Sequence, residues 1–199
     1  FSYDPSLASS IETGITPQSN NPDDPTWMKS PELIGFTFID FPVTGSNHKA
    51  VISVFSIEEY SQLDPSTVET FAQLQTLLAA RPSDPETPLP YMPVVNAGQV
   101  IAARIHYIDF ENGSGIAYLT QYAQDVSPIN NQALFYTFQG VTNDGIWYVT
   151  ADFPVTHPEL PPDSNIEDYN AFADSFSQYL VEIKAFLDNQ PRSEEHTSE

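Results

Sequence analysis

Cysteine is absent from the 199-residue chain. A chain without cysteine forms no disulfide, holds no metal through thiolates and uses no cysteine as a nucleophile. These three kinds of site are therefore excluded. The compartment stays open, because exported proteins also fold without disulfides.

Positive charge is nearly as scarce, with six Lys and Arg against 27 Asp and Glu and a net charge of -21 at pH 7. Binding to nucleic acid or to an anionic membrane surface depends on clustered Lys and Arg, so we expect neither partner. The acidity fits an exported protein kept soluble by its charge, an adaptation to salt, or the binding of divalent cations. The 13% share of aromatic residues argues against a disordered acidic chain.

Long apolar runs are missing too, and none approaches the roughly 20 residues of a membrane-spanning helix. We therefore expect no membrane span. The sequence opens at Phe1 rather than Met, so we expect that something upstream was removed or not captured, and whether it was a signal peptide or lipidated leader stays open. At the other end, residues 192–199 match the translated read-through of a common sequencing adapter, and we expect 191–199 to be an artefactual tail.

Catalytic fingerprints are absent as well. The sequence has no G-x-S-x-G elbow, no H-E-x-x-H motif, no P-loop and no dinucleotide-binding glycine motif. A catalytic pair of carboxylates cannot be chosen among 27 acids by sequence alone. An enzyme is therefore the less favoured interpretation.

Residues 100–155 are rich in β-branched and aromatic residues and are divided by Gly, Asn, Asp and Pro, a pattern typical of an antiparallel sheet. Two earlier segments alternate apolar side chains in the same way. In the first of them, the side with Ile34, Phe36 and Phe38 is expected to be buried. The expected strands are 33–39, 50–57, 100–110, 116–124, 133–139 and 146–155.

Two helices are predicted, each by a capping-box pattern followed by apolar residues at helical spacing. The first box runs from Ser66 to Glu69 and predicts a helix to about residue 80. Its apolar side is formed by Val68, Phe71, Leu74, Leu77 and Leu78. The second box runs from Ser164 to Glu167 and predicts a helix over 166–188.

The expected organisation is an N-terminal arm at 1–30, pinned to the core by Trp27, and a single domain at 31–190. The domain is α+β, an antiparallel sheet of about six or seven strands with two main helices packed on it. The helix at 166–188 has an apolar side that must be covered, and the sheet is the simplest cover.

The turn at 109–115 has the most functional appearance. Asp109, Glu111 and Asn112 carry oxygen atoms that could hold Ca²⁺, and the loop at 125–131 adds those of Asp125, Asn130 and Asn131. The alternative is a hairpin in which Asn112 and Gly113 take left-handed conformations. We favour the hairpin, because the 12-residue spacing of a calcium loop is absent. Calcium is the one cofactor that the sequence suggests.

A second hairpin turn is predicted at 142–145, with Asp144 as a turn former. Arg104 is one of the few cations and is expected to pair with a carboxylate. His106, His157 and a carboxylate would make a three-ligand metal set, although no spacing in the sequence brings them together.

Two aromatic pairs, Tyr118 with Tyr122 and Tyr136 with Phe138, alternate along predicted strands. On a solvent face, either pair would offer rings to a glycan or an apolar partner. The alternative, which we favour, is packing in the core. The exposure of each ring decides between them.

Several segments together resemble a family of exported, lipoprotein-like bacterial envelope proteins without an assigned function. These segments are 112–115, 119–122, 128–131, 135–140, 144–145 and 157–158. The resemblance implies an extracytoplasmic location and supplies no catalytic residue. The order of an early hairpin, a helix, antiparallel strands and a final helix is also similar to the PsbP/Mog1 fold.

The expected function is a non-catalytic, extracytoplasmic module of the bacterial cell envelope that binds a protein or glycan partner. The alternative is a cation-dependent protein or enzyme with its site around the 109–115 and 125–131 loops. The oligomeric state stays open.

Overall fold

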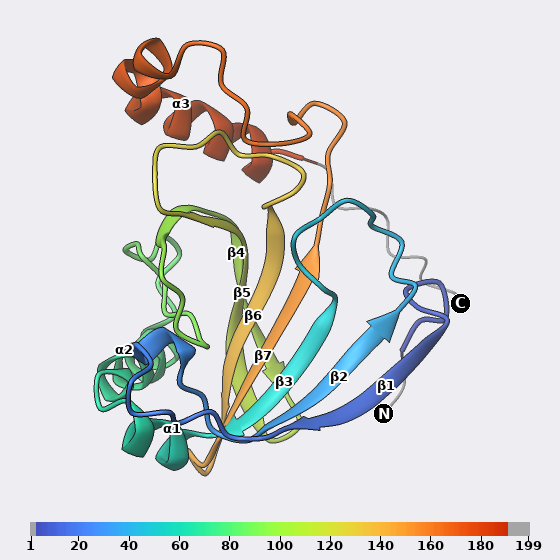
Figure 1. Ribbon diagram of the computed structural model, residues 1–199, viewed down its shortest axis with the longest axis vertical. Helices are drawn as coiled ribbons and strands as arrows, with labels where there is room; N and C mark the ends of the chain where they lie inside the picture. The colour runs from blue at the N-terminus through green and yellow to red at the C-terminus, as the bar shows by residue number, and fades with distance from the viewer. Residues whose placement is uncertain (1–2, 191–199) are drawn as a thin grey trace.

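Seven antiparallel strands form one twisted sheet in the order β1-β2-β3-β7-β6-β5-β4 (Figure 1). The structure, a computed structural model, describes residues 3–190. The strands are β1 (Ser10–Thr16), β2 (Leu33–Ile39), β3 (Val51–Ser56), β4 (Gly98–Phe110), β5 (Gly113–Ala123), β6 (Phe135–Thr142) and β7 (Trp147–Pro154). With helices α1 (Ile57–Leu63), α2 (Thr67–Ala80) and α3 (Tyr169–Asp188), the protein has an α+β fold, as the sequence predicts.

All six predicted strands are confirmed, and both predicted hairpin turns join neighbouring strands. The seventh strand, β1, lies in the segment that we expected to be an arm, and that expectation is wrong for residues 10–16. Trp27 does not pin this segment to the core. It lies in a short 3-10 turn (Thr26–Met28) and is 44% exposed.

The helix predicted after residue 66 is confirmed, but its capping box is not. Ser66 makes no side-chain cap, and its backbone N–H and hydroxyl both donate to Oδ1 of Asp64, at 3.0 and 2.7 Å. Asp64 thus bonds the start of α2 from the turn after α1, a helix that the sequence did not predict. Arg81, with φ of 44°, ends α2 in a left-handed conformation.

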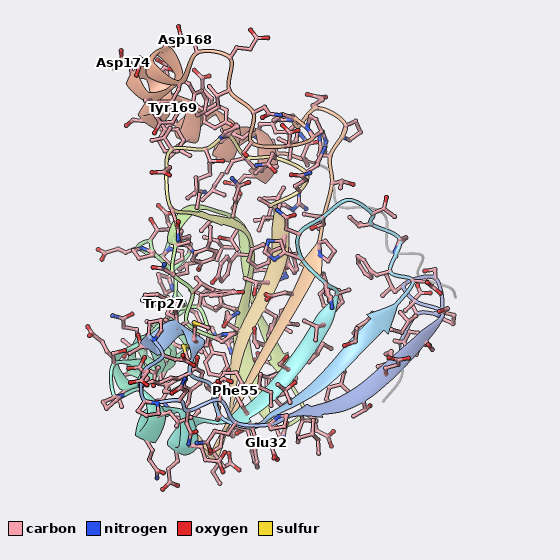
Figure 2. The ribbon with its side chains drawn as sticks, viewed as in Figure 1. Trp27, Glu32, Phe55, Asp168, Tyr169 and Asp174 are labelled. Atoms are coloured by element: carbon pink, nitrogen blue, oxygen red, sulfur yellow. The ribbon has the colours of Figure 1, made fainter. Side chains whose placement is uncertain are left out.

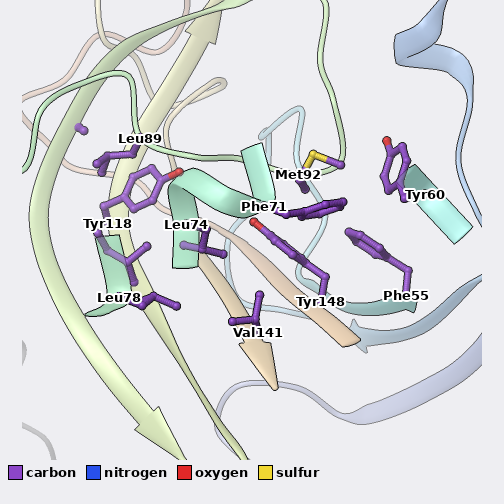
Figure 3. Close-up of a cluster of buried hydrophobic side chains, with 12 residues drawn as sticks. Phe55, Tyr60, Phe71, Leu74, Leu78, Leu89, Met92, Tyr118, Val141 and Tyr148 are labelled. Carbon is purple, nitrogen blue, oxygen red and sulfur yellow. The ribbon is translucent and has the colours of Figure 1, made fainter. Parts of the chain in front are cut away.

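Helices α1 and α2 and the proline-rich loop at 82–98 pack on one face of the sheet (Figure 3). We call this side the packed face. Its core combines helix residues such as Leu74 with rings from the strands, and Phe55 and Tyr148 stack at a centroid distance of 5.1 Å. Val68, which the helical pattern assigned to the apolar side of α2, is 54% exposed.

Helix α3 packs on the opposite face, but only at one end. Its last turns bury Leu187 and pack Ile183 and Phe186 against β4 and β5. Its first turns, with Asp168, Tyr169 and Asp174, extend beyond the sheet (Figure 2). The expectation that this helix covers the sheet is therefore wrong over most of that face.

The start of α3 also differs from the prediction. Asp168, not Ser164, caps the helix by accepting a hydrogen bond from the backbone N–H of Ala171 at 3.1 Å. Its other end is held by Arg104, whose guanidinium donates to the carbonyls of Leu187 and Gln190. The backbone N–H of Arg104 donates to the carboxylate of Asp188 at 2.6 Å. The guanidinium therefore caps a helix rather than forming the predicted ion pair with a carboxylate of the described residues.

Among residues 3–190, no helix is long and apolar enough to cross a membrane. The predicted artefactual tail at 191–199 lies outside the described residues.

Candidate functional site

Strand alternation and register divide the sheet side chains between the packed face and an opposite face. On the opposite face, the part of the sheet that α3 does not cover carries apolar side chains that no other element of residues 3–190 buries, apart from Tyr136, which packs at the margin of the α3 cluster. We call this surface the open face. It consists of Ile15, Ile34, Val54, Ile108, Phe110, Tyr136, Phe138, Trp147 and Val149.

Three members of the open face are strongly exposed: Ile15 at 65%, Trp147 at 41% and Ile108 at 37%. The other six are half-buried. They lie further along the strands than the cluster beneath the end of α3 and the small cluster around Phe38, towards the end of the sheet that carries Trp147 and Phe110. The open face is thus a band that runs across the sheet.

Two glycines of β5 allow aromatic rings to lie against the backbone of this band. A Cβ atom at Gly113 would be 2.2 Å from the Phe110 ring, and one at Gly115 would be 2.2 Å from the Phe138 ring. The rings of Phe110 and Phe138 meet edge to face at a centroid distance of 6.0 Å. The two rings can therefore occupy these positions only because Gly113 and Gly115 of β5 have no side chain.

Charge is absent from the open face of this very acidic chain. None of its nine residues is charged, and the three carboxylates in the strands, Glu12, Asp109 and Asp152, all belong to the packed face by register. A contiguous apolar surface that is kept free of charge is typical of a binding site.

The two predicted aromatic pairs fall on different faces. Tyr118 is fully buried on the packed face, where its hydroxyl donates to the carbonyl of Pro90 at 3.0 Å. Tyr122 lies on the same face against Tyr91. Tyr136 and Phe138 both belong to the open face, and the hydroxyl of Tyr136 lies 2.6 Å from Nε2 of His106. Tyr122, Tyr136 and Phe138 are all half-buried, so the pairs differ in the face to which they belong and in the complete burial of Tyr118.

The turn of the first hairpin consists of Glu111 and Asn112, since Phe110 pairs directly with Gly113. Neither Asn112 nor Gly113 has a positive φ, so the predicted left-handed conformations are wrong. The glycine is needed instead because a Cβ would lie 2.4 Å from the carbonyl oxygen of Val141.

The predicted calcium ligands do not converge at this turn. The carboxylate of Asp109 forms a two-pronged ion pair with Arg81, which lowers its pKa. Glu111 and Asn112 are exposed beside it. A guanidinium at the first ligand would repel a cation, so nothing in this geometry favours the calcium interpretation.

The side chains in the 125–131 loop hold the loop itself. Asn130 is buried and accepts hydrogen bonds from the backbone of Gln132 and Ala133. Asn131 donates to the carbonyls of His157 and Leu160. These amides are used for structure. Asp125 is exposed.

The two histidines lie in different surroundings. His106 contacts Tyr136 and the carbonyl of Arg104, whereas His157 packs against the Phe186 ring and contacts Gln190. No group of three His, Cys, Asp or Glu side chains suited to a metal ion occurs among residues 3–190.

A polar network on the packed face was not found from the sequence. Asp152 accepts hydrogen bonds from Tyr91 at 2.9 Å and from Thr137 at 2.6 Å. Gln139 continues the network by accepting from the hydroxyl of Tyr148 at 2.6 Å. Removal from water raises the pKa of Asp152, and the two hydrogen bonds oppose this only in part. No pattern in the sequence separates this carboxylate from the other acids.

Asp152 gives the first testable prediction. Because its pKa in the folded chain lies above the ordinary value of 3.8, the native state binds more protons, and the free energy of unfolding falls as pH rises through that range. Asp152→Asn removes the charge and keeps an acceptor and a donor for Thr137 and Tyr91. We expect a gain on the order of 1 kcal/mol at pH 7 and almost none at pH 3, measured by urea unfolding.

Asp144→Asn is the matched control with the opposite sign. The hydroxyl of Thr142 lowers the pKa of Asp144 in its exposed turn, so this variant should lose stability at neutral pH and lose less at pH 3. Equal pH profiles for the two variants would contradict the assignment of Asp152.

In comparison with known proteins, the chain matches no family model, no curated protein and no solved structure. The resemblances to envelope proteins and to the PsbP/Mog1 fold stay predictions.

Proposed function

We propose that the protein is a non-catalytic, extracytoplasmic module of the bacterial cell envelope that binds a protein partner through its open face. The uncharged apolar band on a chain of net charge -21 is the single observation that carries the proposal. Exposed apolar residues of this kind lower the solubility of a protein, and burial against a bound partner accounts for their presence.

The composition of the open face suits a protein interface. Aromatic residues are enriched at the centres of such interfaces, and charged residues are depleted there. Phe110, Tyr136, Phe138 and Trp147 supply four rings within one band of the sheet. Trp147, exposed at 41%, is the most exposed of these four rings.

A protein partner fits this face better than a glycan. A sugar site needs hydrogen-bonding groups beside its aromatic rings. Here the Tyr136 hydroxyl is hydrogen-bonded to Nε2 of His106. The hydroxyl of Thr142, at the margin of the band, donates to Asp144 at 2.5 Å. These two hydroxyl groups near the rings are thus already paired within the chain.

The extracytoplasmic location rests on the family resemblance and on the acidic surface, which suits an exported protein. Fractionation of cells that express the natural gene tests it. Recovery of the protein from the cytoplasmic fraction alone would exclude the envelope.

Site-specific cross-linking tests the binding surface. A photoreactive phenylalanine analogue at Trp147 or at Ile108 is expected to cross-link to the same envelope protein, identified by mass spectrometry. Phe138→Asp should reduce the yield at both positions at least about tenfold, because a buried unpaired carboxylate costs several kcal/mol at an interface.

Val68 supplies the matched control position. It is 54% exposed on α2, which packs on the other face of the sheet. An analogue at Val68 should give no cross-link to that protein. Equal yields from Val68 and Trp147 would show that the open face is not the binding surface.

A further inference from the structure

Strand β1 forms one edge of the sheet, and within residues 3–190 it pairs with β2 alone (Figure 1). Six of its seven residues are exposed. Edge strands of natural proteins are usually protected by Lys, Pro, inward-pointing charges or a covering segment. Residues 10–16 contain no Lys and no Pro, and their one charged residue, Glu12, belongs to the packed side.

The register of the sheet determines which backbone groups of β1 point outward. The N–H of Phe38 donates to Ala50, towards β3. By alternation, the backbone groups of Leu33, Gly35, Thr37 and Ile39 point towards β1. Their partners in β1 are Thr16, Gly14, Glu12 and Ser10. The N–H and C=O groups of Ile11, Thr13 and Ile15 therefore face away from the sheet.

We propose that two copies of this chain associate through their β1 strands, which pair antiparallel about a two-fold axis at Thr13. In this register Thr13 faces Thr13 of the second copy, and Ile11 faces Ile15 of the second copy. Each pair exchanges two hydrogen bonds, so all three outward residues of each strand are used. This interface uses the backbone of β1 and adjoins the open face at Ile15, and it does not depend on the proposed partner.

The side chains suit the same register. Ile11 and Ile15 belong to the open side, so the isoleucine pairs join the open faces of the two copies into one continuous surface. Glu12 lies opposite Gly14 of the second copy, and no carboxylate of β1 faces another one. The strand is therefore self-complementary residue by residue.

The charge of the whole chain opposes this association. Each copy carries -21 at pH 7, and the repulsion is screened as the Debye length falls from about 30 Å at 0.01 M salt to about 3 Å at 1 M. Dimerisation through β1 must therefore strengthen with added salt. A cationic partner at the same edge would show the opposite salt dependence.

Sedimentation velocity of the full chain over a range of concentrations, at 0.01 and 1 M NaCl, tests the proposal. We expect a monomer–dimer equilibrium that shifts towards the dimer in high salt. Thr13→Pro removes the outward N–H at the axis from both copies and should raise the dissociation constant about tenfold or more. Thr13→Val keeps the N–H and should dimerise like the unaltered chain. A monomer under all conditions would overturn the proposal.

Single cysteines test the register, because the chain has none of its own. Thr13→Cys should form an intermolecular disulfide under mild oxidation, since residues of a hydrogen-bonded pair lie about 5.5 Å apart between Cα atoms. Ile11→Cys and Ile15→Cys should each fail alone and cross-link when mixed. A dimer without the Thr13→Cys disulfide would overturn the register, and a dimer that Thr13→Pro leaves intact would overturn the use of β1. Circular dichroism checks that each variant is folded.

Discussion

Replacing Leu74 with alanine is expected to lower the free energy of unfolding by about 2–5 kcal/mol, measured by urea unfolding followed by circular dichroism. Leu74 is fully buried, and it lies where α2 meets strand residues such as Tyr148 and Val141 (Figure 3). The truncation removes apolar contacts and leaves a cavity that rings locked in mutual contact cannot fill.

Val68→Ala is the control on the same helix. Both residues follow the helical apolar pattern, but Val68 is 54% exposed, so its truncation should change stability by less than about 0.5 kcal/mol. Similar losses for the two variants would contradict the orientation of α2.

The position of α2 was predictable because its sequence repeats apolar residues at helical spacing over 14 residues. Its first residue was not, because a capping box records only local hydrogen-bonding capacity. Here Asp64, whose side chain is 3% exposed, takes both the N–H and the hydroxyl of Ser66. A tertiary position, the turn that joins α1 to α2, overrides the local motif.

Strand β1 shows a different limit of the sequence pattern. Residues 10–16 contain two isoleucines, and the strand forms because β2 offers a free edge. An edge strand buries little, so its sequence needs little apolar alternation. Strands with neighbours on both sides, such as β5 with its buried Ile116 and Tyr118, were predictable because burial demands apolar residues.

The candidate site was half predictable. Alternation along the strands puts Tyr136 and Phe138 together on one face of the sheet, and Tyr118 and Tyr122 likewise share a face. The sequence alone does not say which face the helices cover. The answer depends on α3, whose apolar stripe predicted a cover for the sheet. Arg104 holds the far end of that helix at the edge strand β4, so most of the face stays open.

Gly113→Ala is expected to be as damaging as a large cavity, although it adds a single methyl group. The new Cβ would lie 2.4 Å from the carbonyl oxygen of Val141 and 2.2 Å from the ring of Phe110. The ring can turn, but the carbonyl belongs to the paired strand β6, so β5 and β6 must separate locally. We expect a loss of about 3 kcal/mol in the free energy of unfolding, the upper end for overpacking. The packing of the Phe110 ring in the open face should be disturbed as well.

Gly14→Ala isolates this steric cause from the general effect of replacing a glycine in a strand. Gly14 lies in β1, and no atom lies within 4 Å of the position of its Cβ. Because alanine has fewer conformations in the unfolded chain, this variant should be neutral or more stable by up to about 1 kcal/mol. Urea unfolding of both variants at low protein concentration separates the two effects. If Gly113→Ala were as harmless as Gly14→Ala, the close approach of β5 and β6 that shapes the open face would be wrong.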